Sequence, residues 1–156
     1  MHFQKRFFAR YWDSQQLPFE LLLQNFDTIA FEDELTPFPQ NLKIDATEVQ
    51  FCRIYFPSVF QHFSPTERVI LDQRDIKENL DKQTIKDVWL PGFNDMLSLL
   101  QECFPPPRQS MPAPSTENIT LGVSIIRLFL KLDPILKYIS SIQGVKDFLG
   151  QALRNQ

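Results

Sequence analysis

Hydrophobic residues recur at three- and four-residue steps along most of the chain, the spacing that places side chains on one face of an α-helix. The longest run of this kind occupies residues 119–153, and its main positions are Ile125, Leu128, Leu132, Ile135, Ile139, Ile142, Phe148, Leu149 and Leu153. The run predicts a helical hairpin or a bent rod. Further apolar residues widen the face beyond one stripe, which indicates burial on two sides. We expect part of the second side to meet another chain.

The same spacing predicts helices along the rest of the sequence. The expected ranges are 3–12, 18–32, 46–56, 65–80, 84–90, 94–103, 117–132, 134–142 and 145–154. Residues 48–56, "EVQFCRIYF", are also β-branched and aromatic enough to form a strand, so both structures are considered there. The first 91 positions contain no glycine and therefore none of the Asn-Gly or Asp-Gly turns that favour short hairpins. The predicted fold class is all-α, a compact multi-helix bundle.

Helix start signals support this class. The sequence Ser64-Pro65-Thr66-Glu67 combines an N-cap, a proline at the first helical position and a capping-box glutamate. The segment that begins at Asp45 and the Asp133-Pro134 pair offer related starts. We therefore expect helices to begin near residues 46, 65 and 134.

A proline-rich stretch, "ECFPPPRQSMPAPSTEN" at residues 102–118, interrupts the helical pattern. Its five prolines remove backbone donors and fix φ, which predicts extended or polyproline II structure. We interpret residues 104–116 as a spacer between a helical core at 1–103 and a C-terminal unit at 117–156 that packs on the core or on a partner. Ser115 or Thr116 can cap the helix that follows. The alternative is that residues 104–108, "FPPPR", form a docking peptide for a polyproline-binding domain.

The first twelve residues predict an amphipathic helix. Its aromatic side holds Phe3, Phe7, Phe8, Tyr11 and Trp12, and its other side holds Lys5, Arg6 and Arg10. Such a helix would not leave five aromatic side chains in water. We expect it to dock on the chain's own core, on a partner protein or on an anionic membrane surface. Phe7 and Tyr11 are accordingly predicted to be buried.

Composition narrows the classes of function. A chain of 156 residues fits one domain, and fifteen phenylalanines predict an aromatic core. A net charge of −3 argues against a nucleic-acid partner. The two cysteines, Cys52 and Cys103, are typical of a reducing compartment. We expect an intracellular protein, cytoplasmic or nuclear, with a mitochondrial presequence as the alternative because the first twelve residues contain bases and no acid.

The familiar catalytic patterns are absent from the sequence. Neither GxxxxGK[ST] nor GxGxxG occurs, and Gly122-Val123-Ser124 lacks the second glycine of a nucleophile elbow. His2, Cys52, His62 and Cys103 lack the paired spacing of zinc ligands. Cys52 and His62 could act as nucleophile and base only if the fold brought them together. We therefore predict no catalytic, cofactor-binding or metal-binding residue.

Residues 72–81 contain four carboxylates, Asp72, Asp75, Glu78 and Asp81, and three of them have bases at a spacing of four residues. The predicted ion pairs are Arg68–Asp72, Arg74–Glu78, Lys77–Asp81 and Glu78–Lys82. This pattern is typical of a solvated helix face and not of a metal or acid–base cluster.

These observations lead to one main functional hypothesis, a noncatalytic intracellular interaction subunit or adaptor that binds another protein or a second copy of itself. The predicted partner-binding residues are Phe7, Tyr11, Leu128, Leu132, Ile135 and Ile139. The first alternative is a peripheral membrane protein that uses the basic-aromatic N-terminal helix. The second is a small enzyme without a recognisable motif.

Overall fold

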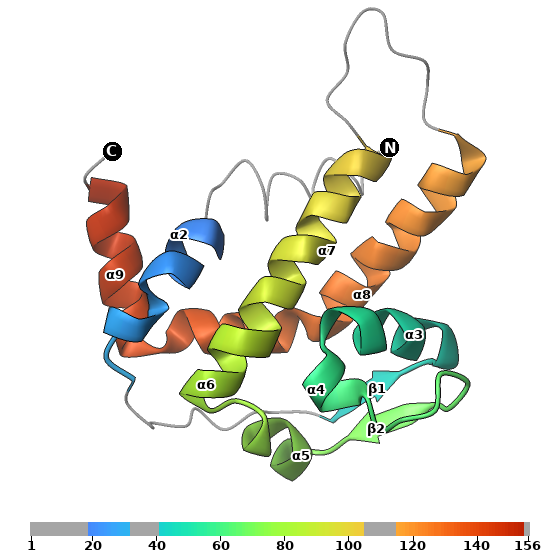
Figure 1. The fold of residues 1–156 in the computed structure, drawn as a ribbon, viewed down its shortest axis with the longest axis horizontal. Helices are drawn as coiled ribbons and strands as arrows, with labels where there is room; N and C mark the ends of the chain where they lie inside the picture. Colours follow the sequence, from blue (N-terminus) through green and yellow to red (C-terminus); the bar gives the residue numbers. More distant parts are fainter. Residues whose placement is uncertain (1–18, 32–40, 105–114, 155–156) are drawn as a thin grey trace, which may run out of the picture.

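The computed structural model describes residues 19–31, 41–104 and 115–154 (Figure 1). Its elements are α2 (Phe19–Asn25), the 3-10 helix η2 (Phe26–Thr28), β1 (Leu42–Ile44), α3 (Ala46–Tyr55), α4 (Pro57–Phe60), β2 (Val69–Leu71), α5 (Gln73–Glu78), α6 (Lys82–Thr84), the π-helical turn η3 (Ile85–Trp89), α7 (Leu90–Cys103), α8 (Thr116–Ser141) and α9 (Gln143–Arg154). The predicted all-α class is confirmed, apart from one small sheet. The expected helix at 3–12, with Phe7 and Tyr11, lies outside the described residues, as does most of the proline-rich spacer.

The segment with two candidate structures, residues 48–56, is helical. Residues 48–55 lie in α3, and Phe56 is its C-cap. Asp45 precedes this helix as the N-cap, and the Asp45 backbone N–H donates to Glu48 Oε1 at 3.0 Å. This bond is half of a capping box, the start signal found in the sequence. The C-terminal unit also begins as expected, because Ser115 Oγ accepts from the Asn118 backbone N–H at 3.1 Å.

The helix expected over residues 65–80 is wrong in its first half. Val69–Leu71 forms β2, which pairs antiparallel with β1, and Leu42, Lys43 and Ile44 lie opposite Leu71, Ile70 and Val69. Both strands bury their outer residues and expose the middle one, a period of two. The Ser64–Glu67 signal closes a turn instead, in which the Ser64 N–H donates to Glu67 Oε2 at 3.3 Å. The helix begins only after Asp72, whose side chain accepts from the Asp75 N–H.

This change of structure alters the predicted ion pairs. Arg74 does pair with Glu78, at 3.2 Å on α5. Arg68 precedes the strand and lies 3.7 Å from Asp45 instead of pairing with Asp72. Lys82 reaches back to η2 and donates to the backbone carbonyls of Asp27 and Ile29. Of these three bases, only Arg74 forms its predicted ion pair, and it lies in the part of the predicted helix that is present in the structure.

Two predicted helix breaks are absent. Pro91 follows the π-helical turn η3, and the helical course from α6 runs through it into α7. Pro91 has no N–H to donate to the preceding turn of the helix. The π-helical turn η3, which is wider than an α-helical turn, ends at Trp89, shortly before this proline. Pro134 lies inside α8, which is one helix from Thr116 to Ser141 and changes direction in its C-terminal half (Figure 1). A proline commonly kinks a helix, and burial of the side chains around it holds the two halves together.

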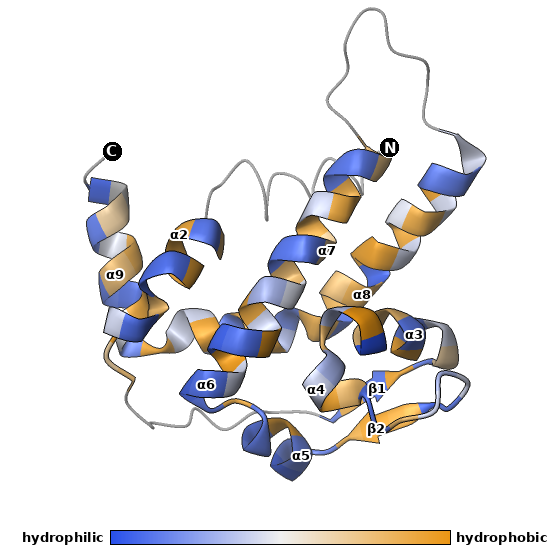
Figure 2. Ribbon diagram, in the orientation of Figure 1, coloured by the Kyte–Doolittle hydropathy of each residue, from blue (hydrophilic) through white to orange (hydrophobic). Residues whose placement is uncertain are grey.

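The core is aromatic, as the phenylalanine content predicted. Phe93 on α7 lies at its centre, with ring centroids 5.0 Å from Phe56, 5.9 Å from Phe129, 6.0 Å from Trp89 and 6.3 Å from Phe19. These four partners come from four different segments of the chain, and one continuous cluster of buried residues extends from α2 to α9. Hydrophobic bands along α7 and α8 mark the sides that the cluster uses (Figure 2). The C-terminal unit therefore shares its core with the rest of the described chain.

Close backbone contact completes this core. Gly92 on α7 is buried, and a Cβ at this position would overlap the Phe56 ring and the Tyr55 carbonyl oxygen. The missing side chain lets α7 approach the junction of α3 and α4 directly. This contact fixes α3 against the core and so positions the outer side of α3.

Candidate functional site

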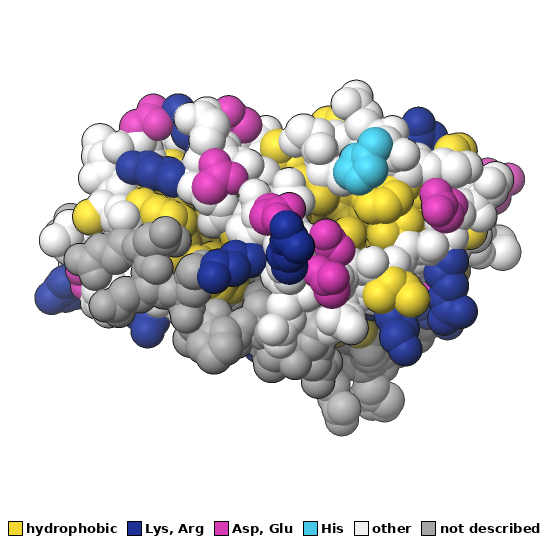
Figure 3. All heavy atoms as spheres, turned by 90° about the horizontal axis from the view of Figure 1, so that it is seen from below, with side chains coloured by type: hydrophobic (Ala, Val, Ile, Leu, Met, Phe, Trp, Pro, Cys, Tyr) yellow, Lys and Arg dark blue, Asp and Glu magenta, His cyan; other side chains and the backbone are white. Residues whose placement is uncertain are grey.

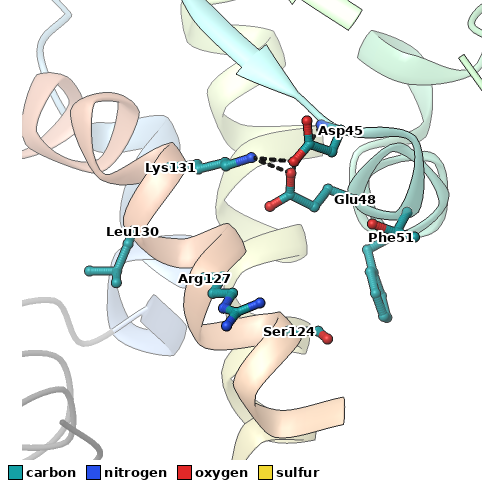
Figure 4. Close-up of a pocket in the computed structure, with 8 residues that line it drawn as sticks. Asp45, Glu48, Phe51, Ser124, Arg127, Leu130 and Lys131 are labelled. Carbon is teal, nitrogen blue, oxygen red and sulfur yellow. Dashed lines mark hydrogen bonds and ion pairs between the residues drawn. The ribbon is translucent and has the colours of Figure 1, made fainter. Parts of the chain in front are cut away.

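A cleft of about 370 Å³ opens between α3 and α8 (Figure 4). Its lining residues are Asp45, Thr47, Glu48 and Phe51 from the first part of α3 and its cap, and Ser124, Arg127, Leu130 and Lys131 from α8. Each set recurs at three- and four-residue steps, so one side of each helix forms one wall. The cleft is thus built on two regular elements that the core holds in place.

Lys131 joins the two walls at one end of the cleft. Its Nζ donates to Glu48 Oε1 at 2.5 Å and to Asp45 Oδ2 at 3.2 Å. Glu48 exposes only 11% of its side chain, and Arg68 also lies 3.7 Å from Asp45. The two carboxylates are therefore matched by two bases. This network ties α8 to the N-terminus of α3.

The cleft shifts the proton affinity of two nearby groups. Burial lowers the pKa of Lys131, but hydrogen bonds to Glu48 and Asp45 outweigh burial and leave the pKa above its ordinary value. Burial raises the pKa of Cys52, the charge of Glu48 raises it further, and Lys131 offsets only part of this. Lys131 is therefore a cation near neutral pH, and Cys52 is a thiol.

Arg127 occupies the other part of the cleft and is exposed. Among the described residues, no carboxylate lies within ion-pair distance of its guanidinium. Half-buried Phe51 and Leu130, which is 39% exposed, supply apolar surface in the cleft. Ser124 Oγ donates to the Thr120 carbonyl at 3.0 Å, so this serine is bonded within its own helix. The cleft thus combines an apolar surface with a cation that is not neutralised by the described chain.

The structure places the four partner-binding residues predicted on α8 on the side of this helix that faces the core. Leu128, Leu132, Ile135 and Ile139 are at most 1% exposed, all within the chain's own core. They belong to the buried cluster that holds the described chain together, and a partner could reach them only if the core opened. The exposed side of α8 carries Arg127 and Lys131, which the sequence showed only as charges that interrupt an apolar run. Their spacing of four, with Ser124 three residues earlier, was the available signal.

The structure does not join Cys52 and His62 into a nucleophile and base. Cys52 is buried on α3, whereas His62 is exposed beyond α4 and stacks on Phe63 with ring centroids 4.1 Å apart. Within residues 19–31, 41–104 and 115–154, no group of three or more His, Cys, Asp or Glu is arranged to hold a metal ion. No described helix is both long enough and apolar enough to cross a bilayer. Neither a family model nor a curated protein nor a solved structure matches the chain.

Proposed function

We propose that the chain is a noncatalytic protein–protein interaction subunit that joins a larger assembly through the outer side of α3 and the adjoining cleft. The observation that carries this proposal is the cleft itself, in which an apolar surface lies beside an arginine without a described carboxylate. Protein interfaces are enriched in aromatic residues and arginine, and these residues supply most of the binding energy. Ile54, which is 69% exposed on α3, extends the apolar surface beyond the cleft.

The chemistry of the cleft supports binding over catalysis. Lys131 is held by two carboxylates and its pKa is raised, so it is a poor general base. The Cys52 thiol is buried and its pKa is raised, so little of the reactive thiolate forms near neutral pH. Lys131 and Cys52 therefore fit a structural role, Lys131 in the wall of the cleft and Cys52 behind it in the core.

A second apolar area supports contact with protein at more than one place. Hydrophobic side chains gather around the histidine on the face seen from below, which carries β1, β2, α4 and α5 (Figure 3). Ile70, the exposed middle residue of β2, is 58% exposed. Contiguous apolar surface of this kind commonly marks a site of protein association.

Site-specific photo-crosslinking in cells of the source organism tests the proposal. A photoreactive phenylalanine analogue would replace Ile54 or Leu130 in the full chain, with exposed Lys146 on α9 as the control position. We expect one protein, or a second copy of the chain, to be captured at both test positions and not at position 146. The proposal fails if neither position captures a protein while light scattering shows a monomer.

A further inference from the structure

We propose that the α3–α8 cleft binds a short acidic and apolar segment of a partner protein. A carboxylate of this segment would bind Arg127, and apolar side chains on either side of the carboxylate would lie against Phe51 and against Leu130. This inference rests on the proposed function and specifies the chemistry of the partner.

The charges of the cleft select an acidic ligand. Asp45 and Glu48 are matched by Lys131 and Arg68, which leaves the positive charge of Arg127. A guanidinium presents a planar fork of donors that fits a carboxylate with two parallel hydrogen bonds. Lys131 provides a second anchor, since an ammonium has three donors and the described contacts use two of them.

The size and surface of the cleft select a short segment. A volume of about 370 Å³ lies near the lower end of the range for small-ligand sites, so it holds one or two side chains. Phe51 and Leu130 lie on either side of Arg127, so each offers apolar surface to a different side chain of the segment, and Arg127 lies one turn from Lys131 on α8 (Figure 4). A carboxylate next to a leucine or phenylalanine in the ligand matches this arrangement.

A nucleic acid fits the same cleft less well. Phosphate-driven binding needs several lysine or arginine side chains placed along the nucleic-acid backbone, each of which neutralises one phosphate. In the cleft, Arg127 is the one basic side chain without a described acidic partner. Asp45, with 57% of its side chain exposed, would repel a polyanion. A peptide brings one carboxylate to Arg127 without a charged backbone, so the arrangement favours peptide over nucleic acid.

Binding of defined peptides to the full-length chain tests the inference. Fluorescein-labelled peptide sets would carry leucine and phenylalanine next to glutamate, with matched sets in which glutamine or lysine replaces glutamate. We expect fluorescence anisotropy to select members of the glutamate set. Their affinity should fall at least about tenfold, or about 1.4 kcal/mol, on replacement by glutamine and in the variant Arg127→Gln.

Two matched controls separate the cleft from general surface effects. Arg74→Gln removes the same charge from exposed α5 and should leave peptide affinity unchanged. Leu130→Ser should weaken binding severalfold, whereas Ile54→Ser, a change at a more exposed site outside the cleft lining, should not. Side-chain NMR signals of Arg127 should shift during the titration, and circular dichroism should show that each variant is folded.

Three results would overturn the inference. The first is equal binding of the glutamate, glutamine and lysine sets. The second is binding of a single-stranded oligonucleotide or of anionic phosphatidylserine vesicles at least as tightly as the peptides, with the same dependence on Arg127. The third is a partner, crosslinked through Ile54, that is still captured in full by Arg127→Gln and Leu130→Ser. This third result would leave the interaction function intact and remove only the cleft as its site.

Discussion

Two regions on opposite sides of α8 use neighbouring residues in different ways. On the core side, Phe129 is fully buried and stacks with Phe93 on α7. On the cleft side, Arg127, Leu130 and Lys131 line an open space against α3. The Phe129–Phe93 contact joins two apolar rings, whereas the second region contains an ion network and an arginine without a described acidic partner. The comparison is the basis of the proposal that the cleft binds a partner while the core holds the fold.

The strongest test of this comparison removes a phenylalanine from each region. Phe93→Ala should lower the free energy of unfolding by about 3–5 kcal/mol, because it leaves a cavity among four aromatic rings. Phe51→Ala, the same change at a half-buried cleft position, should cost less than about 1.5 kcal/mol. Urea titration followed by circular dichroism measures both. Equal losses would show that the cleft wall supports the fold as strongly as the core does.

A smaller effect is expected where two backbones touch. Gly92→Ala adds a Cβ that overlaps the Phe56 ring and the Tyr55 carbonyl, and overpacking of this kind costs about 1–3 kcal/mol. Gly150→Ala on α9 is the matched control, since the nearest described atom that its Cβ would meet is Arg154 Nη2, at 3.9 Å. The control should gain up to about 1 kcal/mol from the higher helix propensity of alanine. Opposite signs in urea titration confirm the close approach of α7, and a gain at both sites contradicts it.

The pH dependence of stability probes Cys52, which is buried on α3 within the core cluster. Its folded pKa is raised above the ordinary value of 9.0, so the thiol ionises in the unfolded chain first. Stability is therefore full below pH 9 and is lost as the pH rises above it. Between pH 8 and pH 10 the loss from this thiol should be about 1.4 kcal/mol. Cys52→Ala should remove this part of the slope, while Cys103 contributes equally to both proteins. The same slope in both proteins would show that Cys52 ionises as readily in the folded chain.

Local signals in the sequence were enough for much of the fold. The capping residues at Asp45 and Ser115 and the apolar spacing located α3 and α8, and the phenylalanine content predicted the aromatic core. The sheet could not be predicted, because three-residue strands carry little periodicity and depend on a pairing partner elsewhere in the chain. The predicted helices ended before Pro91 and Pro134, whereas both prolines lie inside helices. Sequence alone does not show that tertiary packing continues a helix through a proline.

The cleft was less predictable than the fold. Its ion network joins Lys131 to residues 83 and 86 positions away in sequence, so no local spacing could reveal it. The apolar pattern of α8 did predict burial on two sides, but it could not show that this chain covers Leu128 and Leu132 itself. Arg127 became a candidate only when the structure showed which side of the helix faces α3.

The smallest expected difference lies within the cleft and compares its two α8 bases. Lys131→Met should lower the free energy of unfolding by about 1 kcal/mol, because Glu48 loses its ion pair but keeps the hydrogen bond from the Asp45 N–H, and partial exposure screens the pair. Arg127→Met should change it by no more than about 0.5 kcal/mol, since no described carboxylate depends on it. Urea titration at low and high salt measures both, and salt should reduce the cost of Lys131→Met. A cost for Arg127→Met equal to that of Lys131→Met would show that the arginine already has a partner within the chain, and the cleft would then have no unmatched charge with which to recognise an acidic segment.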